Sequence, residues 1–444
     1  MTLLIQIAQF VFIISVLVIL HELGHFLPAK YFKTKVEKFY LFFDYKFSLF
    51  KKKIGDTEYG IGWIPFGGYV KIAGMIDESM DREQLKKPAQ PWEFRSKPAW
   101  QRLIIMMGGV LVNFFLAWFI YSAMLMYYGD QYIDNSKLEY GVYVGEIGEK
   151  LGIKTGDKII SIDGKVVKVF DKVPISILLG DEMTVNRNGE NITFPLKDEI
   201  KKLVLDLEGK NFIIPAFPPI IGDVVDGSPA QKATIQKGDE IIRINDKPTF
   251  SWSDLVKGIK ESRKDTMRVL VNRKDKLINL NVFMSDSIMG VKGSEDLTKK
   301  YFKENFENHD KYSFVTSIPK GFEKTISSVT DQVRSFKLVF NKKTKGYTKV
   351  KGPIGIVTVM APTWNWHFVW RFMAMFSVWL AFLNLLPIPA LDGGHIVFLL
   401  YEMISGRAPS QKVMEYAQIA GFIIVMTLMF LVIGNDIYRA IFGA

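Results

Sequence analysis

Two histidines and a glutamate lie at the end of a long apolar segment, within the stretch VLVILHELGHFLPAK at residues 16–30. His21, Glu22 and His25 form an H-E-x-x-H pattern, and on a helix the four-residue step places both imidazoles on one face. This spacing suits one zinc ion, with Glu22 able to act on a water molecule at an open coordination position. Three ionisable side chains in an apolar span are costly unless they have partners and a use. The pattern therefore predicts a zinc hydrolase, and a snorkelling interfacial cluster is the alternative.

A zinc hydrolase needs a third protein ligand, and the chain contains no cysteine. The ligand must therefore be His, Asp or Glu. The segment NLLPIPALDGGH at residues 384–395 places Asp392 and His395 in an apolar stretch that prolines and glycines interrupt. Broken backbone at membrane depth is expected only where it lines a cavity in the protein. From chemistry alone Asp392 and His395 compete as the third ligand, and Asp392 could instead cap the following helix.

The composition favours a membrane protein, because 48% of the 444 residues are hydrophobic and only 23% are charged. Lysines follow the first apolar segment, whereas no lysine or arginine precedes it. We therefore expect a membrane span and not a signal peptide, with the N-terminus outside and residues 28–102 in the cytoplasm. Four crossings would return the C-terminus to the outside. The segments long and apolar enough to span are 3–27, 103–128, 367–403 and 412–436.

The net charge of +11 could indicate nucleic-acid binding. However, the basic residues are spread along the chain and are denser beside the apolar segments, as in KYFKTKVEK and LFKKKIG. This distribution is typical of cytoplasmic loops that face lipid. We expect membrane lipid as a partner and no nucleic acid.

The residues between the second and third spans contain an internal repeat. IKTGDKIISIDGKVV begins at Ile153, and IQKGDEIIRINDKPT begins at Ile235. Each copy predicts a Gly-Asp turn, a short strand with alternating isoleucines and a second turn. Two small β-rich domains are therefore predicted, at 129–212 and 213–286. Both resemble PDZ domains, which typically take an extended peptide onto a sheet edge, and spacers without a ligand are the alternative.

Two further regions have readable patterns. Residues 287–366 are predicted to be a linker with an amphipathic helix over 318–340, which could lie in the membrane interface, pack on the enzyme or form a plain core stripe.

Residues 58–72, EYGIGWIPFGGYVKI, predict a β-hairpin. Its edge could accept a substrate strand, with Gly67, Gly68 and Tyr69 as substrate-binding residues. An ordinary cytoplasmic hairpin is the alternative.

The chain resembles the site-2 proteases, a family of intramembrane zinc metalloproteases. The similarity includes HELGH in the first span, NLLPIPALDGG as the family's N-x-x-P-x-P-x-x-D-G motif, and the PDZ-like pair between them. It implies that His21, His25 and Asp392 bind one Zn²⁺ per chain and that Glu22 is the general base. The resemblance, and not the spacing, favours Asp392 over His395.

The resemblance also assigns two asparagines and reveals two departures. Asn113 and Asn384 match polar positions that the family places near the active site, so we expect them to contact substrate; interhelical hydrogen bonding is the alternative. Where many relatives have Gly-x-Gly in a membrane-entering loop, this chain has Phe-Phe-Asp at 42–44. The second-span motif G-P-x-x-N is present as GVLVN at 109–113, without its proline.

The function implied by the resemblance is hydrolysis of peptide bonds within transmembrane segments. The substrates would be single-pass membrane proteins already shortened outside, such as anti-sigma factors, and remnant signal peptides. The location would be a bacterial cytoplasmic (inner) membrane, with both termini and the PDZ-like domains on the periplasmic side. A non-catalytic PDZ-bearing membrane scaffold is the alternative from another class. A transporter with a proton relay is weaker, because the four spans show no repeat between halves.

Overall fold

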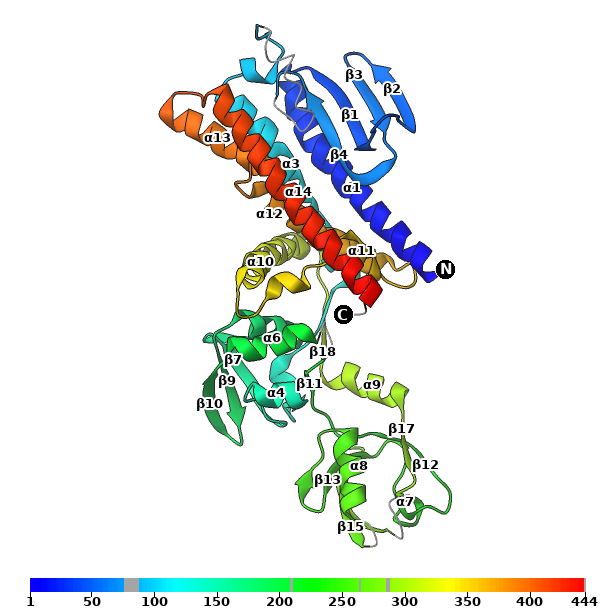
Figure 1. The fold of residues 1–444 in the computed structure, drawn as a ribbon. Helices are drawn as coiled ribbons and strands as arrows, with labels where there is room; N and C mark the ends of the chain where they lie inside the picture. Colours follow the sequence, from blue (N-terminus) through cyan, green and yellow to red (C-terminus); the bar gives the residue numbers. More distant parts are fainter. Residues whose placement is uncertain (76–87, 208–210, 263–264, 285–287, 443–444) are drawn as a thin grey trace. The chain divides into compact units, whose positions relative to one another are not determined.

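The computed structural model describes all residues except 76–87, 208–210, 263–264, 285–287 and 443–444. The chain forms two compact units, which the ribbon in Figure 1 shows with the sequence coloured from blue to red. The helical unit contains residues 1–129, 311–336 and 350–444, and the β-rich unit contains residues 130–310 and 337–349. The expected end of the second β-rich domain, at residue 286, lies outside the described residues.

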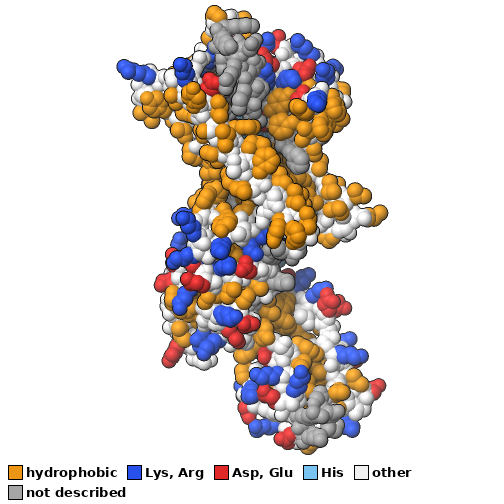
Figure 2. Space-filling model, viewed as in Figure 1, with side chains coloured by type: hydrophobic (Ala, Val, Ile, Leu, Met, Phe, Trp, Pro, Cys, Tyr) orange, Lys and Arg blue, Asp and Glu red, His pale blue; other side chains and the backbone are white. Residues whose placement is uncertain are grey.

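Among the described residues, four helices are long and apolar enough to cross a membrane, as the sequence predicts. Large apolar side chains are exposed on these helices, for example Phe119 at 70% and Phe430 at 67%. Figure 2 shows hydrophobic side chains over much of this unit, whereas charged side chains are interspersed over the β-rich unit. Such an apolar surface suits lipid. The helices are α1 (Thr2–Tyr31), α3 (Ala99–Tyr128), α12 (Trp366–Leu385) and α14 (Gln411–Phe442).

The segment expected to form one span at 367–403 is divided into two helices, α12 and α13 (Asp392–Ser405). Leu386 is extended, with ψ of 142°, because a proline follows it. Neither Pro387 nor Pro389 has an N–H group to donate to a continuing helix. The prediction of a single helix is therefore wrong, whereas the expected break in the backbone is present.

A four-stranded sheet with the order β2-β3-β1-β4 belongs to the helical unit. β1 pairs in parallel with β3 and antiparallel with β4. The expected hairpin over 58–72 is therefore wrong: β3 and β4 follow each other in the chain, but both pair with β1 and lie on either side of it. The antiparallel hairpin is formed by β2 and β3. The strands are β1 (Val36–Phe43), β2 (Phe50–Ile54), β3 (Thr57–Ile61) and β4 (Ile64–Ile72).

α10 (Phe314–Phe340) includes the amphipathic helix expected at 318–340. Within the helical unit it packs on α3, where the indole N–H of Trp118 donates to the carbonyl of Ile318 over 2.9 Å. The ring of Phe322 lies 5.2 Å from that of Trp118, centroid to centroid. The buried residues of α10 are small, namely Ser317, Gly321 and Thr325, whereas Ile318, Phe322 and Ile326 on its apolar face are 38–43% exposed. The helix thus contacts α3 chiefly through its small residues, and the alternatives that the sequence leaves open for its apolar face stay open. The short helix α11 (Pro353–Thr358) follows in the same unit.

The two repeat copies fold with the same strand order. In the first module, residues 142–215, the sheet order is β10-β9-β7-β8, and in the second, residues 221–293, it is the equivalent β16-β15-β13-β14. In each module the first strand also pairs with the last, β6 with β11 and β12 with β17. The strands are β6 (Val142–Val144), β7 (Lys158–Ile162), β8 (Lys165–Val166), β9 (Glu182–Arg187), β10 (Glu190–Pro195), β11 (Ile213–Pro215), β12 (Ile221–Val224), β13 (Glu240–Ile244), β14 (Lys247–Pro248), β15 (Thr266–Arg273), β16 (Lys276–Phe283) and β17 (Val291–Gly293).

The turns of each module follow the sequence. Gly156 and Gly238 precede the isoleucine strands with φ of +94° and +90°, a conformation that favours glycine. The isoleucines at the inward positions of β7 and β13 are buried in separate cores. The helices are α4 (Glu146–Lys150), α5 (Val173–Leu179) and α6 (Asp198–Asp206) in the first module, and α7 (Pro229–Lys232) and α8 (Trp252–Glu261) in the second.

The module boundaries differ from the expected ones. β11 begins at Ile213 and pairs with β6, so the first module extends beyond residue 212. Residues 287–366 are not simply a linker, because α9 (Glu295–Asn305) and β18 (Glu307–Asp310) lie within them. β18 pairs with β5 (Asp130–Ile133), and Phe306 is buried in the first module's core. Pairing between strands distant in sequence explains why local patterns missed these boundaries.

Candidate metal centre

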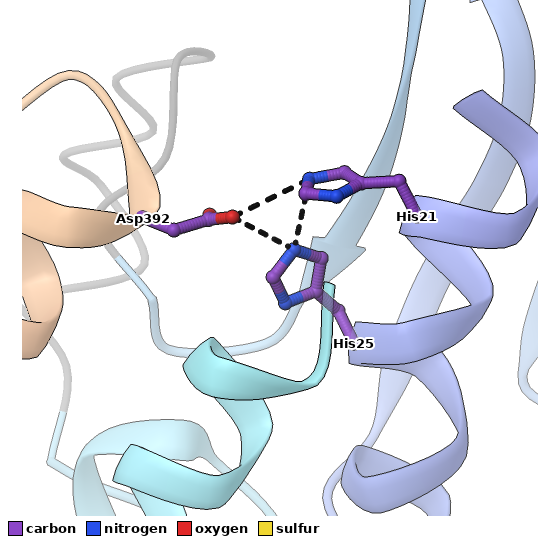
Figure 3. A group of neighbouring side chains, drawn as sticks. All are labelled: His21, His25 and Asp392. Carbon is purple, nitrogen blue, oxygen red and sulfur yellow. Dashed lines mark hydrogen bonds and ion pairs between the residues drawn. The ribbon is translucent and has the colours of Figure 1, made fainter. Parts of the chain in front are cut away.

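Three side chains that could hold a metal ion converge in the helical unit (Figure 3). His21 and His25 lie one turn apart on α1, and Asp392 is the first residue of α13. The Asp392 Oδ2 atom lies 3.3 Å from the Nε2 atoms of both histidines, and the two Nε2 atoms are also 3.3 Å apart. One ligand atom from each residue lies within 4.8 Å of the others. Among the described residues this group does not include His395.

Glycines let α1 and α3 approach closely and leave space between them for the two imidazoles. Gly24 lies between the two histidines in the sequence, and a Cβ atom there would lie 2.4 Å from the carbonyl oxygen of Gly108. A Cβ atom on Gly109 would lie 2.4 Å from His25 Nε2 and 2.6 Å from His21 Cε1. Any larger residue at Gly109 would therefore displace the imidazoles. Sequence reasoning noted Gly109 only as part of a motif, although a glycine four residues before Asn113 was a usable signal.

The loop before α13 is equally tight. A Cβ atom on Gly393 would lie 2.1 Å from the carbonyl oxygen of Leu386, and one on Gly394 would lie 2.2 Å from Pro389 Cα. These two glycines let the chain turn back on itself directly after the proline-interrupted segment. The backbone turn thereby places the Asp392 carboxylate opposite the histidines of α1.

Three groups on α3, at four-residue steps, face these histidines. The Nδ1 atom of His25 lies 2.9 Å from the carbonyl oxygen of Ile105. Gly109 lies beneath the imidazoles, and the amide nitrogen of Asn113 lies 3.1 Å from His21 Nδ1. Asn113 is fully buried. A carbonyl oxygen can only accept, so His25 Nδ1 carries the proton and its Nε2 lone pair faces the cluster.

Asn384 lies on α12, half-buried, with its amide nitrogen 3.3 Å from His21 Nε2. It is therefore beside the metal-facing nitrogen, whereas Asn113 is beside the other nitrogen of the same ring. Ser377, about two turns before Asn384 on the same face of α12, donates its hydroxyl to the backbone carbonyl of Asn113 over 2.7 Å. This hydrogen bond joins α12 to α3 at the level of the site, and sequence reasoning gave no signal for it.

The strand β4 lies against α1 beside the site. A Cβ atom on Gly68 would lie 2.6 Å from the Val18 side chain, which is one turn before Glu22. The backbone N–H of Val70 interacts with the Glu22 carboxylate. Gly67 has φ of +134°, and its backbone faces the ring of Phe43. The structure therefore brings Gly68 and Val70 of β4 beside α1 near Glu22, whereas the Cβ position of Gly67 faces Phe43.

Tyr69 points to the opposite face of the sheet from Gly68. Its ring stacks on Tyr40 at 5.4 Å and on Phe43 at 6.2 Å between centroids. Its hydroxyl donates to Asp44 Oδ1 over 2.9 Å, and the ammonium of Lys38 lies 3.2 Å from Asp44 Oδ2. Burial and the hydrogen bond to Asp44 raise the pKa of Tyr69 above its usual value. Burial opposes ionisation of Asp44, but hydrogen bonds from Tyr69 and Lys38 outweigh it and lower the pKa of that carboxyl.

The Phe-Phe-Asp segment at residues 42–44 adopts a backbone conformation that usually requires glycine. Phe42 has φ of +66°, a region that side-chain-bearing residues rarely adopt, at a register shift between β1 and β4. Asp44 takes part in the polar network with Tyr69. The loop therefore keeps a left-handed residue at the first of the positions where the family pattern has glycine.

Comparison with known proteins assigns the family. The model of peptidase family M50 matches residues 9–428. The chain belongs to peptidase family M50. It is 29% identical to the regulator of sigma E protease of Haemophilus influenzae, over 98% of this chain and 99% of that protein. It is 26% identical to protease RseP of Yersinia pestis, over 99% of this chain and 100% of that protein.

A further relative, from Vibrio cholerae, is named provisionally as a zinc metalloprotease and is 28% identical over 97% of this chain and 98% of that protein. Membership of a peptidase family, together with the four apolar helices, makes the chain a multi-pass membrane peptidase with a β-rich insert.

Proposed function

We propose that this chain is a zinc-dependent endopeptidase that cleaves peptide bonds within transmembrane segments. The observation that carries the proposal is the convergence of His21, His25 and Asp392 from two apolar helices. Two imidazoles and a carboxylate are a donor set that suits Zn²⁺. The Asp392 Oδ2 atom is buried without a hydrogen-bond donor, so a cation would supply the partner that it lacks.

The other residues would act on the substrate and on water. When bound, zinc supplies positive charge that polarises a peptide carbonyl and makes a water molecule more acidic. Glu22 would accept the water proton and return it to the leaving nitrogen. The N–H group of Val70 orients the Glu22 carboxylate from the side of β4. Asn384, beside the metal-facing nitrogen of His21, would contact the substrate at the scissile bond.

A helical substrate must open before attack, because its carbonyls are bonded within the helix. β4 is the edge strand of its sheet, and no strand pairs with its second edge among the described residues. We propose that an unwound substrate segment adds to this edge, where Gly67 and Gly68 leave room for its backbone. The face of β4 adjoins α1 where Gly68 meets Val18, one turn before Glu22, so a strand bound at the neighbouring edge would pass near Glu22.

The substrates we propose are single-pass membrane proteins already shortened outside, such as anti-sigma factors, and remnant signal peptides. Relatives named regulator of sigma E protease support the first class. The lysines after α1 support a cytoplasmic location for residues 28–102, in a bacterial inner membrane. The termini and the two modules would then lie on the periplasmic side.

The first experiment measures bound metal and cleavage together. Purified wild-type protein is expected to contain one zinc per chain, and Glu22→Gln is expected to keep it and lose cleavage of a membrane-embedded substrate, because Gln cannot accept the proton. His25→Ala is expected to lose the metal. A protein without stoichiometric zinc would support the non-catalytic scaffold, and cleavage retained in Glu22→Gln would refute the role of that residue.

The modules are proposed to be PDZ-like domains that exclude bulky substrates, and their shared strand order supports the common domain type. β5 and β18 pair, with Ile133 opposite Glu307. A short turn can therefore replace residues 135–305 while the helices keep their connection. Screening predicts that this variant cuts full-length substrates, whereas peptide delivery predicts slower cleavage even of shortened ones. Full-length substrate left uncut, with the shortened form cut more slowly, would refute screening.

A further inference from the structure

The surroundings of Asn113 differ from those expected of a substrate-binding residue. Its side chain is fully buried in α3, and its amide nitrogen lies 3.1 Å from Nδ1 of His21, the ring nitrogen that faces away from Asp392. The Ser377 hydroxyl fixes its backbone carbonyl. A residue held in this way reaches the ligand histidine and leaves no accessible atom for a peptide.

The tautomer of His21 decides whether this residue can bind a metal. A neutral imidazole has one N–H group and one lone pair, so Nε2 is a ligand only if Nδ1 carries the proton. For His25 the Ile105 carbonyl enforces this tautomer. For His21 the group beside Nδ1 is an amide, which can present either its oxygen or its nitrogen.

The orientation of an amide is an assignment from the hydrogen-bond network, because its oxygen and nitrogen have nearly the same shape. With nitrogen facing His21, the Asn113 Oδ1 atom is buried and has no hydrogen-bond donor. No described donor therefore fixes Oδ1 in that orientation, and only His21 Nδ1 contacts the amide nitrogen. Rotation of the amide by 180° would place Oδ1 against His21 Nδ1, where it could accept the ring proton.

We infer that Asn113 is a positioning residue: its side-chain oxygen accepts the Nδ1 proton of His21 and so leaves the Nε2 lone pair free for zinc. Ile105 and Asn113 thus perform the same task for the two histidines, one with a backbone oxygen and one with a side-chain oxygen, on the same face of α3. The inference rests on the proposed zinc site. Acceptors of this kind around a metal are typically worth about 10- to 100-fold in metal affinity.

The test is a zinc titration of metal-free protein against a competing chelator, in detergent or nanodiscs. Asn113→Ala is expected to weaken zinc binding about 10- to 100-fold. Asn113→Asp is expected to bind zinc at least as tightly as wild type, because a carboxylate can only accept and would impose the same tautomer. Equal loss in Ala and Asp, or no loss in Ala, would overturn the inference.

A matched control separates tautomer from packing. Gln9, on α1, is another side-chain amide that is fully buried. It donates to the backbone carbonyls of Ala361 and Thr363, away from the histidines. Gln9→Ala is expected to lower stability while leaving zinc affinity within about 2-fold of wild type. Zinc affinity lost equally in Gln9→Ala and Asn113→Ala would point to helix packing and overturn the inference.

A direct measurement reads the tautomer of His21 in the wild-type protein and needs a variant only to assign the signal. The chain has five histidines, so ¹⁵N-histidine labelling gives few signals, and His21→Gln identifies one of them. Zinc-loaded wild type is expected to show the His21 proton on Nδ1, whereas a proton on Nε2 would overturn the inference. Wild type that binds no zinc at all would instead refute the proposed function, so the two failures are distinguishable.

Discussion

Buried aspartates in the two units have opposite surroundings. In the first module Asp157 is 1% exposed, and Arg187 donates to both of its carboxylate oxygens over 2.8 and 2.7 Å. The backbone N–H of Lys154 adds a third hydrogen bond of 2.8 Å. In the second module Asp239 repeats this arrangement with Arg273, whose two bonds are both 2.7 Å long. These acids are fully paired and neutralised, and they join the turn before one strand to a neighbouring strand.

Asp392 in the helical unit has no such partner. Two imidazoles face its Oδ2 atom at 3.3 Å, and that atom has no hydrogen-bond donor among the described residues. A buried acid whose oxygens are all paired needs nothing further and stabilises a fold. One that faces other lone pairs is stable only with a cation. The surroundings, and not burial itself, therefore separate the structural aspartates from the candidate ligand.

The strongest test of this contrast removes the unpaired acid. Asp392→Ala is expected to reduce zinc affinity by more than about 100-fold, because two imidazoles alone make a poor site. His395→Ala, three residues later on α13, is expected to keep about one zinc per chain. Metal analysis after dialysis against a chelator distinguishes them. Zinc lost only in His395→Ala would mean that the third ligand is His395.

The reverse test removes a paired acid. Asp157→Ala leaves the guanidinium of Arg187 without its partner, and we expect the first module to lose about 3 kcal/mol of stability. Zinc content is expected to be unchanged, because this residue lies outside the metal cluster. Hydrogen exchange of the first module measures the loss. The double variant Asp157→Leu with Arg187→Met is a control that should recover part of it, and a loss of zinc in either variant would break the contrast.

A subtler test changes the space around the candidate ligands. Gly109→Ala places a methyl group within 2.4 Å of His25 Nε2, so we expect zinc affinity to fall about 10-fold as the imidazoles move. Gly434→Ala is the matched control, since a Cβ atom there meets nothing within 4 Å on α14. It is expected to gain up to about 1 kcal/mol in stability from helix propensity. Equal zinc affinity in both variants would show that the space at Gly109 is not needed.

The sequence predicts the local parts of the site well. The spacing of His21 and His25 follows from the helix period alone, and the break near Asp392 follows from prolines and glycines. Choosing Asp392 over His395 depended on resemblance to a family, because both residue types bind zinc. The two modules were predictable from a repeat whose turns and strands are local.

Other parts depend on contacts between distant segments. The order β2-β3-β1-β4 could not be predicted from the sequence, because β1 and β3 are parallel neighbours in the sheet although β2 lies between them in the chain. The contribution of Phe306 to the first module, and that of Gly109 to the space for the imidazoles, likewise arise only on packing. The face of Tyr69 depends on sheet register, since a shift of one residue moves every side chain to the other face.

The smallest expected change in stability concerns Asp44, an acid that is neither fully paired like Asp157 nor unpaired like Asp392. Asp44 is partly exposed and paired with Tyr69 and Lys38, which hold its pKa below the usual value. Its folded-state pKa is thus below the unfolded value of about 3.9, so its contribution is present above that pH and is lost as the pH falls toward the folded pKa. Asp44→Asn is therefore expected to cost up to about 1 kcal/mol at pH 7 and progressively less in acid. Denaturant unfolding of both proteins between pH 7 and pH 3 measures the difference, and a difference that grows in acid would show that Asp44 is not stabilised as a carboxylate.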